Sequence, residues 1–188
     1  MGVKDIIKPM VVLGALFFFA LVFINEPSSA GEILTYLSYT ATFATVTFIV
    51  YERWLWRWIP YKRPPILKRY YDGELEYIWK KVLEKKPICI EVKQSLFSVR
   101  ISTKTDINKS NSITASLVHE HGNYYLYYTY ITSPDATIQK TNPIQHGACR
   151  MALLNGTHRV EGNYWTSSST VGKATWIAND KMAGQVNV

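Results

Sequence analysis

The chain has 188 residues, a formal net charge of +7 and two cysteines, which limits it to one domain with added membrane segments and excludes a disulfide-rich secreted scaffold. The basic excess is denser near the N-terminus: residues 1–70 hold 8 Lys and Arg against 4 Asp and Glu, which leaves 13 and 10 for residues 71–188. This distribution favours anionic lipid as a partner and argues against a DNA or RNA polymer.

Two uncharged apolar runs of helical length open the chain, at residues 9–24 and 33–51. A span needs about 20 largely apolar residues, so both are candidates. We therefore predict a two-transmembrane hairpin over residues 1–51. The loop between the runs carries Glu26 and Glu32 and no Lys or Arg, so the positive-inside rule places both ends of the chain in the cytoplasm.

A cleavable signal peptide is the alternative explanation for the first run. Lys4 and Lys8 precede its apolar core, and residues 28–30 resemble a cleavage site. A cleaved chain would cross the membrane once, at the second run, and the parts that follow would still reach the cytoplasm.

The second run contains small and hydroxylated residues that permit close approach between helices: Ser38, Ala41, Thr42, Thr45 and Thr47. They are compatible with self-association of the spans. The alternative is a plain two-span hairpin in which each hydroxyl bonds back to its own helix backbone. The sequence does not choose between the two.

Residues 51–71 mix aromatic and basic side chains. Six Lys and Arg stand against the single acid Glu52, interleaved with Trp54, Trp56, Trp58, Tyr61, Tyr70 and Tyr71. Trp and Tyr concentrate at the headgroup level, and clustered Lys and Arg beside a span attract anionic lipid. Three prolines in this stretch end the helix. We interpret residues 52–70 as a basic-aromatic juxtamembrane linker that contacts membrane lipids.

From Leu75 onward the hydrophobic period changes to two, the period of β-strands. About eight short alternating segments follow, joined by tight turns such as Asn155-Gly156 and by polar loops at 104–112 and 133–143. Such meanders close into up-and-down barrels because closure removes exposed edges. We predict that residues 71–188 form a cytoplasmic, eight-stranded, lipocalin-like β-barrel, so the fold class is membrane α plus all-β.

The predicted inward faces divide into two sets. The first set is apolar: Ile90, Val92, Val99, Ile101, Leu117, Met151 and Leu153. The second set is polar or aromatic: Tyr77, Trp79, Gln94, Thr103, Tyr128, Tyr130, Tyr164 and Thr166. Phe97 and Ile113 are expected to face inward as well. Buried hydroxyls need partners, which a polar ligand can supply; alternatively the tyrosines reach the rim and meet water.

No catalytic or metal-binding pattern is found in the sequence. His119 and His121 point the same way on a strand, without a third ligand, and there is no glycine-rich phosphate loop, GxSxG elbow or paired-acid motif. In the cytoplasm Cys89 and Cys149 are expected to be reduced and to pack as small apolar groups. We therefore expect a binding protein without a metal or cofactor, and not an enzyme.

Several stretches resemble the two-transmembrane, β-strand-rich effectors of bacterial CBASS anti-phage operons. They are YIWKK at 77–81, IEVKQSLFSVRIST at 90–103, YYLYYTYITSP at 124–134, HGACRMAL at 146–153 and VEGNYWTSSSTVGK at 160–173. Together with the paired spans, the resemblance covers essentially the whole chain. Two positions depart from it: Ser168 stands where a basic residue is expected, and Lys81 where glycine is expected.

The resemblance implies that the barrel binds a cyclic dinucleotide made by a partner CD-NTase after infection. Binding is then implied to promote homo-oligomerisation, and the spans to disrupt the inner membrane, so that the infected cell dies or stops growing.

The residues that we expect to bind this ligand follow from the alternation, since they share a predicted inward position and a polar or aromatic side chain: Trp79, Gln94, Thr103, Tyr128, Tyr130, Tyr164 and Thr166. Aromatic faces such as Trp79 are expected to stack on bases. Amide and hydroxyl groups are expected to read base edges or meet phosphate. Arg100 and Arg150 are the nearest cations, but the alternation points both outward.

Two other hypotheses remain open from the sequence. The apolar half of the lining is compatible with a membrane-anchored lipid or fatty-acid carrier of lipocalin-like shape. A structural membrane protein with a filled barrel and no ligand is the third. Because a ligand stabilises only the fold that binds it, a screen of cyclic dinucleotides and fatty acids distinguishes all three.

Overall fold

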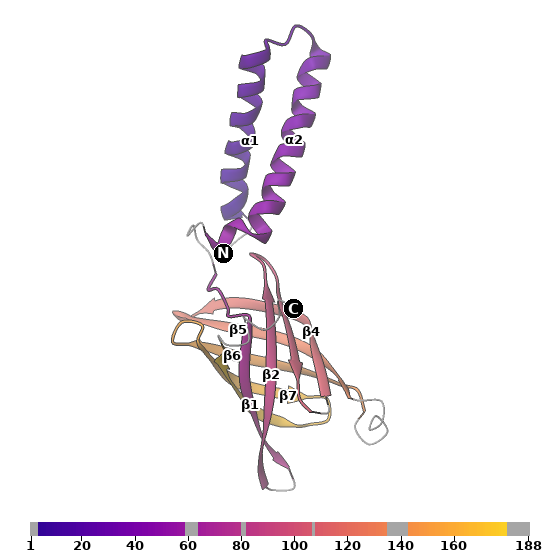
Figure 1. Ribbon diagram of the computed structural model, residues 1–188, viewed down its shortest axis with the longest axis vertical. Coiled ribbons are helices and arrows are strands. Elements are labelled where there is room, and N and C mark those ends of the chain that lie inside the picture. The colour runs from indigo at the N-terminus through magenta and orange to yellow at the C-terminus, as the bar shows by residue number, and fades with distance from the viewer. Residues whose placement is uncertain (1–3, 59–63, 80–81, 107, 135–142, 180–188) are drawn as a thin grey trace. The chain divides into compact units, whose positions relative to one another are not determined.

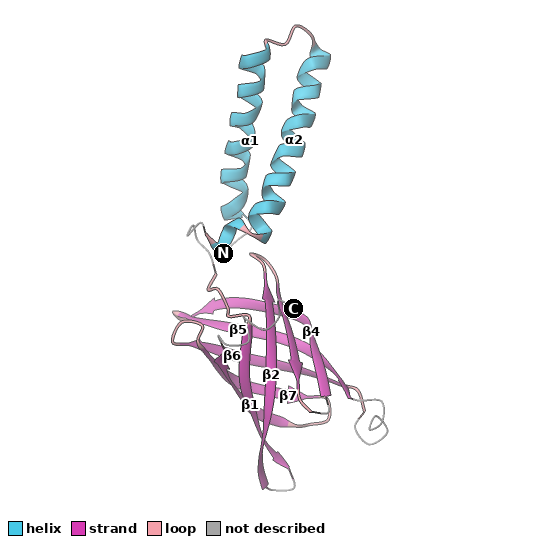
Figure 2. Ribbon diagram, in the orientation of Figure 1, coloured by secondary structure: helices cyan, strands magenta, loops and turns pink. Residues whose placement is uncertain are grey.

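The computed structural model describes residues 4–58, 64–79, 82–106, 108–134 and 143–179. The chain divides into two compact units, Met1–Pro64 and Pro65–Val188, which are considered one at a time. The first unit is a helical hairpin and the second is built from β-strands (Figures 1 and 2).

Two long helices make up the first unit. Helix α1 spans Lys4–Asn25, α2 spans Ala30–Arg53, and a short 3-10 helix, η1, follows at Leu55–Arg57. Both long helices are long and apolar enough to cross a membrane. Ser29 starts α2 by accepting the N–H of Glu32 at 3.3 Å, and the Glu32 carboxylate accepts the N–H of Ser28 at 2.8 Å, a reciprocal cap.

The two helices pack through a glycine and a pair of rings. A Cβ added at Gly14 would lie 3.8 Å from the Thr40 methyl and 3.9 Å from the Ala44 methyl, so the glycine permits close contact. Phe17 stacks on Phe43 with ring centroids 4.2 Å apart.

The hydroxyls on the exposed side of α2 bond within their own helix. Ser38, Thr42 and Thr45 each donate to the carbonyl four residues earlier, at 3.0, 3.0 and 2.8 Å. This is the arrangement expected of a plain hairpin. Self-association of the spans through this face stays a prediction.

Eight antiparallel strands form the second unit. They are β1 Tyr70–Trp79, β2 Val82–Gln94, β3 Val99–Lys104, β4 Asn108–Glu120, β5 Asn123–Pro134, β6 Gln145–Leu154, β7 Arg159–Thr166 and β8 Val171–Ala178. Each pairs with its neighbours in chain order, and β8 closes on β1. The predicted up-and-down barrel after two apolar helices is confirmed.

The interior of the barrel is filled by side chains, as expected for eight strands. Its buried members follow the predicted alternation and include Ile88, Ile90, Val92, Ile101, Leu126, Tyr128, Cys149, Met151, Val160, Tyr164 and Trp176. Leu126, Met151 and Val160 are 0% exposed. The apolar half of the predicted lining is therefore a packed core.

The barrel end at which β1 begins, called the linker end below, is closed by the chain itself. Leu67 inserts into the core and is 6% exposed. The Gln94 amide accepts the N–H of Leu67 at 2.8 Å and donates to the carbonyl of Pro65 at 3.0 Å. The Tyr71 hydroxyl accepts the N–H of Lys68 at 2.9 Å. These contacts hold the segment before β1 across the linker end.

Two expectations about the juxtamembrane stretch are wrong. Strand β1 begins at Tyr70, not at Leu75. Tyr71, which we expected at the headgroup level, is 1% exposed in the barrel core, and Trp56 is 0% exposed. Aromatic residues suit a protein core as well as a membrane interface, so composition alone does not separate the two.

Two expectations about β3 and β4 are also wrong. The loop predicted over 104–112 is partly strand, because β4 begins at Asn108 and cross-strand hydroxyls such as Ser110 and Thr132 bond at 2.8 Å. A shift of register between Ser112 and Thr114 turns Ile113 outward, where it is 59% exposed.

The turn between β2 and β3 contains a further correction. Phe97, expected inward, is 44% exposed, whereas its neighbour Leu96 is buried at 6%. The turn interrupts the alternation, so the inward position moves by one residue.

Replacing Leu67 by Ala should destabilise the barrel by about 2–5 kcal/mol, the usual cost of truncating a buried leucine. The matched control is Leu83→Ala, since Leu83 is 60% exposed and its truncation removes little buried area. Urea unfolding of the full chain in detergent micelles, followed by near-ultraviolet circular dichroism, measures both. Equal midpoints for the two variants would show that Leu67 is not part of the core.

Candidate functional site

Four inward tyrosines gather inside the barrel. Tyr128 and Tyr130 lie on β5 with ring centroids 5.8 Å apart. Cys149 of β6 lies opposite Tyr128 on one side and opposite Tyr164 of β7 on the other. Tyr77 of β1 packs against the same core and acts electrostatically on Tyr164. We call Tyr77, Tyr128, Tyr130 and Tyr164 the tyrosine cluster.

Two of these rings lie over glycines of the neighbouring strand. Tyr130 is opposite Gly147, and Tyr164 is opposite Gly172. A Cβ at Gly147 would overlap the Tyr130 ring, and a Cβ at Gly172 would lie 2.6 Å from a ring carbon of Tyr164. The missing side chains therefore make the space that the rings occupy. A glycine at an inward strand position therefore indicates, from the sequence alone, that a neighbouring strand can place a large ring there.

Burial keeps the cluster protonated. It raises the pKa of Tyr164 to about 12, with smaller contributions from the Tyr77 hydroxyl and the Cys149 thiol. Burial also raises the pKa of Tyr130, and that of Tyr128 well above its ordinary value. At neutral pH each hydroxyl therefore carries a proton to donate. The cluster offers hydrogen-bond donors and flat apolar ring faces, without charge.

Two predicted threonines lie toward the opposite end of the barrel, where β1, β3, β5 and β7 finish and which we call the far end. Thr103 on β3 is half-buried and pairs with Ser110 of β4. The Thr166 hydroxyl is 2.9 Å from the Ser168 hydroxyl and accepts the N–H of Thr170 at 3.3 Å. The inner face is thus apolar toward the linker end and rich in hydroxyls toward the far end.

The remaining two predicted residues are the last residues of their strands. Gln94 ends β2 at the linker end, where its amide bonds to Pro65 and Leu67, so a ligand would have to displace these bonds to use it. Trp79 ends β1 at the far end. The structure therefore brings together the tyrosines but separates Gln94 from them.

Sequence reasoning also missed a buried donor. The indole N–H of Trp176 is buried and has no acceptor among the residues that the structure describes. Its ring lies 5.9 Å from that of Tyr128. A buried donor without an acceptor costs roughly 1–3 kcal/mol, which an internal water or a polar ligand atom would recover. Strand parity shows that Trp176 faces inward, but not that its N–H lacks an acceptor.

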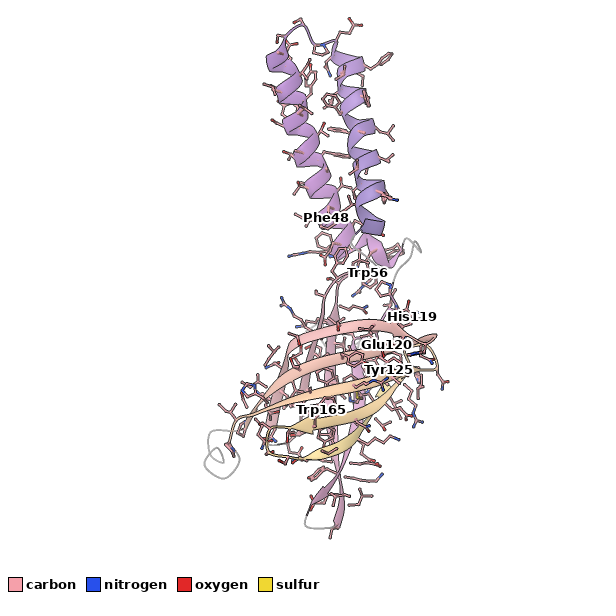
Figure 3. All side chains as sticks on the ribbon, turned by 180° about the vertical axis from the view of Figure 1, so that it is seen from behind. Phe48, Trp56, His119, Glu120, Tyr125 and Trp165 are labelled. Atoms are coloured by element: carbon pink, nitrogen blue, oxygen red, sulfur yellow. The ribbon has the colours of Figure 1, made fainter. Side chains whose placement is uncertain are left out.

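Arg100 and Arg150 lie on the outer face of the barrel, as the alternation predicts. The Arg150 guanidinium is 4.1 Å from the centre of the Tyr125 ring, donates to the Tyr127 hydroxyl at 2.8 Å and lies 3.7 Å from Glu120. Figure 3 labels Tyr125 and Glu120 on this outer wall. Arg100 is exposed as well. Neither arginine points into the tyrosine cluster.

A surface hollow of about 410 Å³ near the far end is lined by residues of both faces of the wall. Tyr130 and Thr166 line it from the inner face, and Ile113 and Trp165 line it from the outer face. Gly147 also lines the hollow and contributes no side chain to it. Residues of the inner and outer faces therefore border the same hollow.

Within the described ranges, no three His, Cys, Asp or Glu side chains are grouped as a metal would require. His119 packs against Tyr124, with ring centroids 4.7 Å apart, and His121 occupies a turn with φ 49°. Cys89 is exposed, Cys149 is buried, and both are free thiols.

Residues 62–177 match the family model described as Cap15, cyclic dinucleotide receptor domain. The chain is 39% identical over 139 residues to CD-NTase-associated protein 15 of Staphylococcus schleiferi, covering 72% of this chain and 75% of that protein. Among solved structures, a redesigned β-barrel aligns with a TM-score of 0.45 and 7% identity over 61% of this chain and 92% of its own. That likeness is too distant to carry an argument.

The stability of the barrel should fall as pH rises from about 10 to about 12. The unfolded chain releases the Tyr164 proton near the ordinary value of 10, whereas the folded chain holds it to a pKa of about 12, so deprotonation favours unfolding in this window. Tyr164→Phe should make the fall shallower than in the unaltered chain. Urea unfolding across the pH range, with Tyr125→Phe on the outer wall as the control, measures this. The same pH dependence in all three proteins would contradict it.

Proposed function

The chain belongs to the Cap15 cyclic dinucleotide receptor family, and we propose that it is a membrane effector of a bacterial CBASS anti-phage system. In this proposal the barrel binds a cyclic dinucleotide released by a cognate CD-NTase. The occupied protein then self-associates, and its two spans disrupt the inner membrane, which kills or arrests the infected cell. The tyrosine cluster, in a chain that matches the receptor domain over residues 62–177, is the observation that carries the proposal.

The chemistry of the tyrosine cluster suits the two parts of a cyclic dinucleotide. Aromatic faces stack on bases, at roughly 1–3 kcal/mol per base. Protonated hydroxyls of Tyr130 and Tyr164, with Thr103 and Thr166 toward the far end, donate to phosphate oxygens or to base edges. An eight-stranded barrel admits one small ligand at most, so a small nucleotide fits this interior better than a DNA or RNA polymer does.

The packing of the core argues against the alternative of a fatty-acid carrier. An acyl chain needs an apolar cavity, and the apolar half of this barrel is occupied by Leu126, Met151 and Val160, each 0% exposed. Leu67 closes the linker end above them. The polar half suits a ligand with many hydrogen-bonding groups.

The proposed topology places the N-terminus and the barrel in the cytoplasm. Glu26 and Glu32 lie at the turn between α1 and α2, whereas Arg53 ends α2 and Arg57 follows it, as the positive-inside rule requires. A receptor for a nucleotide that is made in the cytoplasm must expose its binding domain there. The spans α1 and α2 then cross the inner membrane as a hairpin.

Self-association is proposed to use the outer wall beside the tyrosine cluster. A cross-strand row there consists of Thr114, Thr129, Ala148, Trp165 and Val171. Trp165 is 47% and Val171 is 66% exposed, and exposed apolar groups of this kind mark interaction surfaces. Because Trp165 shares its hollow with Tyr130 and Thr166, an occupied site can alter this surface.

Removing an inward hydroxyl should weaken ligand binding. Tyr130→Phe and Thr166→Val should each raise the dissociation constant roughly five- to tenfold, since one hydrogen bond contributes about 1–1.5 kcal/mol. The controls are Tyr127→Phe and Thr129→Val, outward residues of β5 that should bind as the unaltered chain does. Calorimetric titration of the full chain in micelles with a panel of cyclic dinucleotides measures all four. Equal affinities for inner and outer variants would refute this site.

A charge on the outer wall should separate binding from assembly. Trp165→Arg should bind the cyclic dinucleotide with unchanged affinity but stay at the oligomeric state of the free protein, because a charge at a self-association surface repels its copy. The control is Ile177→Arg, a 52% exposed residue of β8, which should still assemble. Analytical ultracentrifugation with and without ligand tests both. Ligand-dependent assembly of Trp165→Arg would place the contact elsewhere.

A further inference from the structure

The β1–β2 hairpin is longer than the barrel wall to which it belongs. Strand β1 loses its β8 partner after Tyr77, which pairs with Gly172. Strand β2 gains its β3 partner only at Cys89, which pairs with Lys104. Residues 78–79 and 82–83 therefore pair only with each other, and residues 84–88 pair with β1 but have no β3 partner, so the hairpin extends past the wall at the far end (Figure 1). We call residues 78–79 and 82–88 the overhang.

One face of the overhang continues the inner face of the barrel. Ile88 is buried in the core, and successive residues of a strand alternate in direction, so Lys86 and Glu84 point to the same side as Ile88. Lys86 lies opposite Leu75, and Glu84 lies opposite Tyr77. Both of these β1 residues pack against the barrel core.

The two adjacent lysines of β2 have different surroundings. Lys85, on the outer face, bonds to Glu74 at 2.7 Å and also to Glu76, and these carboxylates raise its pKa. Lys86 is half-buried, and within the described part of the chain it has neither an ion pair nor a hydrogen-bond acceptor. A partly buried ammonium without a counter-ion gains much from an anion.

A chain of polar groups connects Lys86's side of the overhang to the tyrosine cluster. Glu84 lies opposite Tyr77, and burial, with a smaller effect of this carboxylate, raises the pKa of Tyr77. Tyr77 acts electrostatically on Tyr164, and Tyr164 acts in the same way on Tyr130. Tyr77 therefore belongs to the tyrosine cluster and also borders the inner face of the overhang.

We propose that Lys86 provides the positive charge that binds a phosphate of the cyclic dinucleotide at the far end of the barrel. This inference rests on the proposed function and adds a residue to its site. The tyrosine cluster contains only neutral donors, whereas a cyclic dinucleotide carries two phosphodiester charges. A charge-assisted hydrogen bond is about twice as strong as a neutral one, and lysine binds phosphate as a point charge.

The test compares Lys86→Ala with Lys85→Ala, neighbours with the same chemistry on opposite faces. The full chain in detergent micelles is titrated by calorimetry with cyclic di-AMP, cyclic di-GMP, cyclic GMP–AMP and cyclic UMP–AMP. For the nucleotide that binds the unaltered chain, Lys86→Ala should raise the dissociation constant at least tenfold and Lys85→Ala less than twofold. Lys86→Arg, which keeps the charge, should recover most of the affinity. Melting temperatures of the free variants check that each is folded.

Salt separates a charge effect from a structural one. If Lys86 binds phosphate, the difference between the unaltered chain and Lys86→Ala should shrink as NaCl rises from about 50 to about 500 mM, because salt screens the charge. Equal affinities for the two alanine variants, or a loss that neither Lys86→Arg nor salt alters, would overturn the role of Lys86 while leaving the receptor function in place. If no nucleotide binds the unaltered chain, the receptor function fails and the role of Lys86 fails with it.

Discussion

The interior of an eight-stranded barrel is only wide enough for its own side chains or for one small ligand, and the site is shaped by this lack of space. Tyr130 and Tyr164 fit because Gly147 and Gly172 stand opposite them. A Cβ at either position would enter the ring's space. Toward the linker end the same narrow interior is filled by apolar side chains such as Met151, 0% exposed. The polar half at the far end is therefore the part that can exchange its contacts for those of a ligand.

Closure of the linker end ties the barrel to the chain that precedes it. The Gln94 amide and the Leu67 side chain hold the segment before β1 in place, so the residues that lead into β1 have a fixed position on the barrel. At the other end, the outer row containing Trp165 shares a hollow with Tyr130. In the proposed mechanism the ligand acts on that hollow, and the outer wall then recruits a second copy. The hairpin of α1 and α2 supplies the membrane part of the response.

The period of two in the sequence is sufficient to predict eight strands and most inward faces, because strand parity depends only on position. It fails where the alternation is interrupted: the register shift beside Ile113 and the turn at Phe97 each move the inward position by one. Parity also does not say how far along the barrel a residue lies. Gln94 was therefore grouped with the tyrosines although it lies at the linker end. Lys86 was missed because the predicted strand begins at Ile88. The structure extends β2 back to Val82 by pairing it with β1 alone, and this pairing cannot be read from the alternation.

The most direct test of the central claim is the melting temperature of the barrel in the full chain, measured in micelles against a panel of cyclic dinucleotides with fatty acids as controls. One cyclic dinucleotide is expected to raise the melting temperature, since a ligand at 100 times its dissociation constant stabilises the fold by about 2.7 kcal/mol. Fatty acids should leave it unchanged. A rise with fatty acid and none with any cyclic dinucleotide would contradict the account and make the protein a lipid carrier.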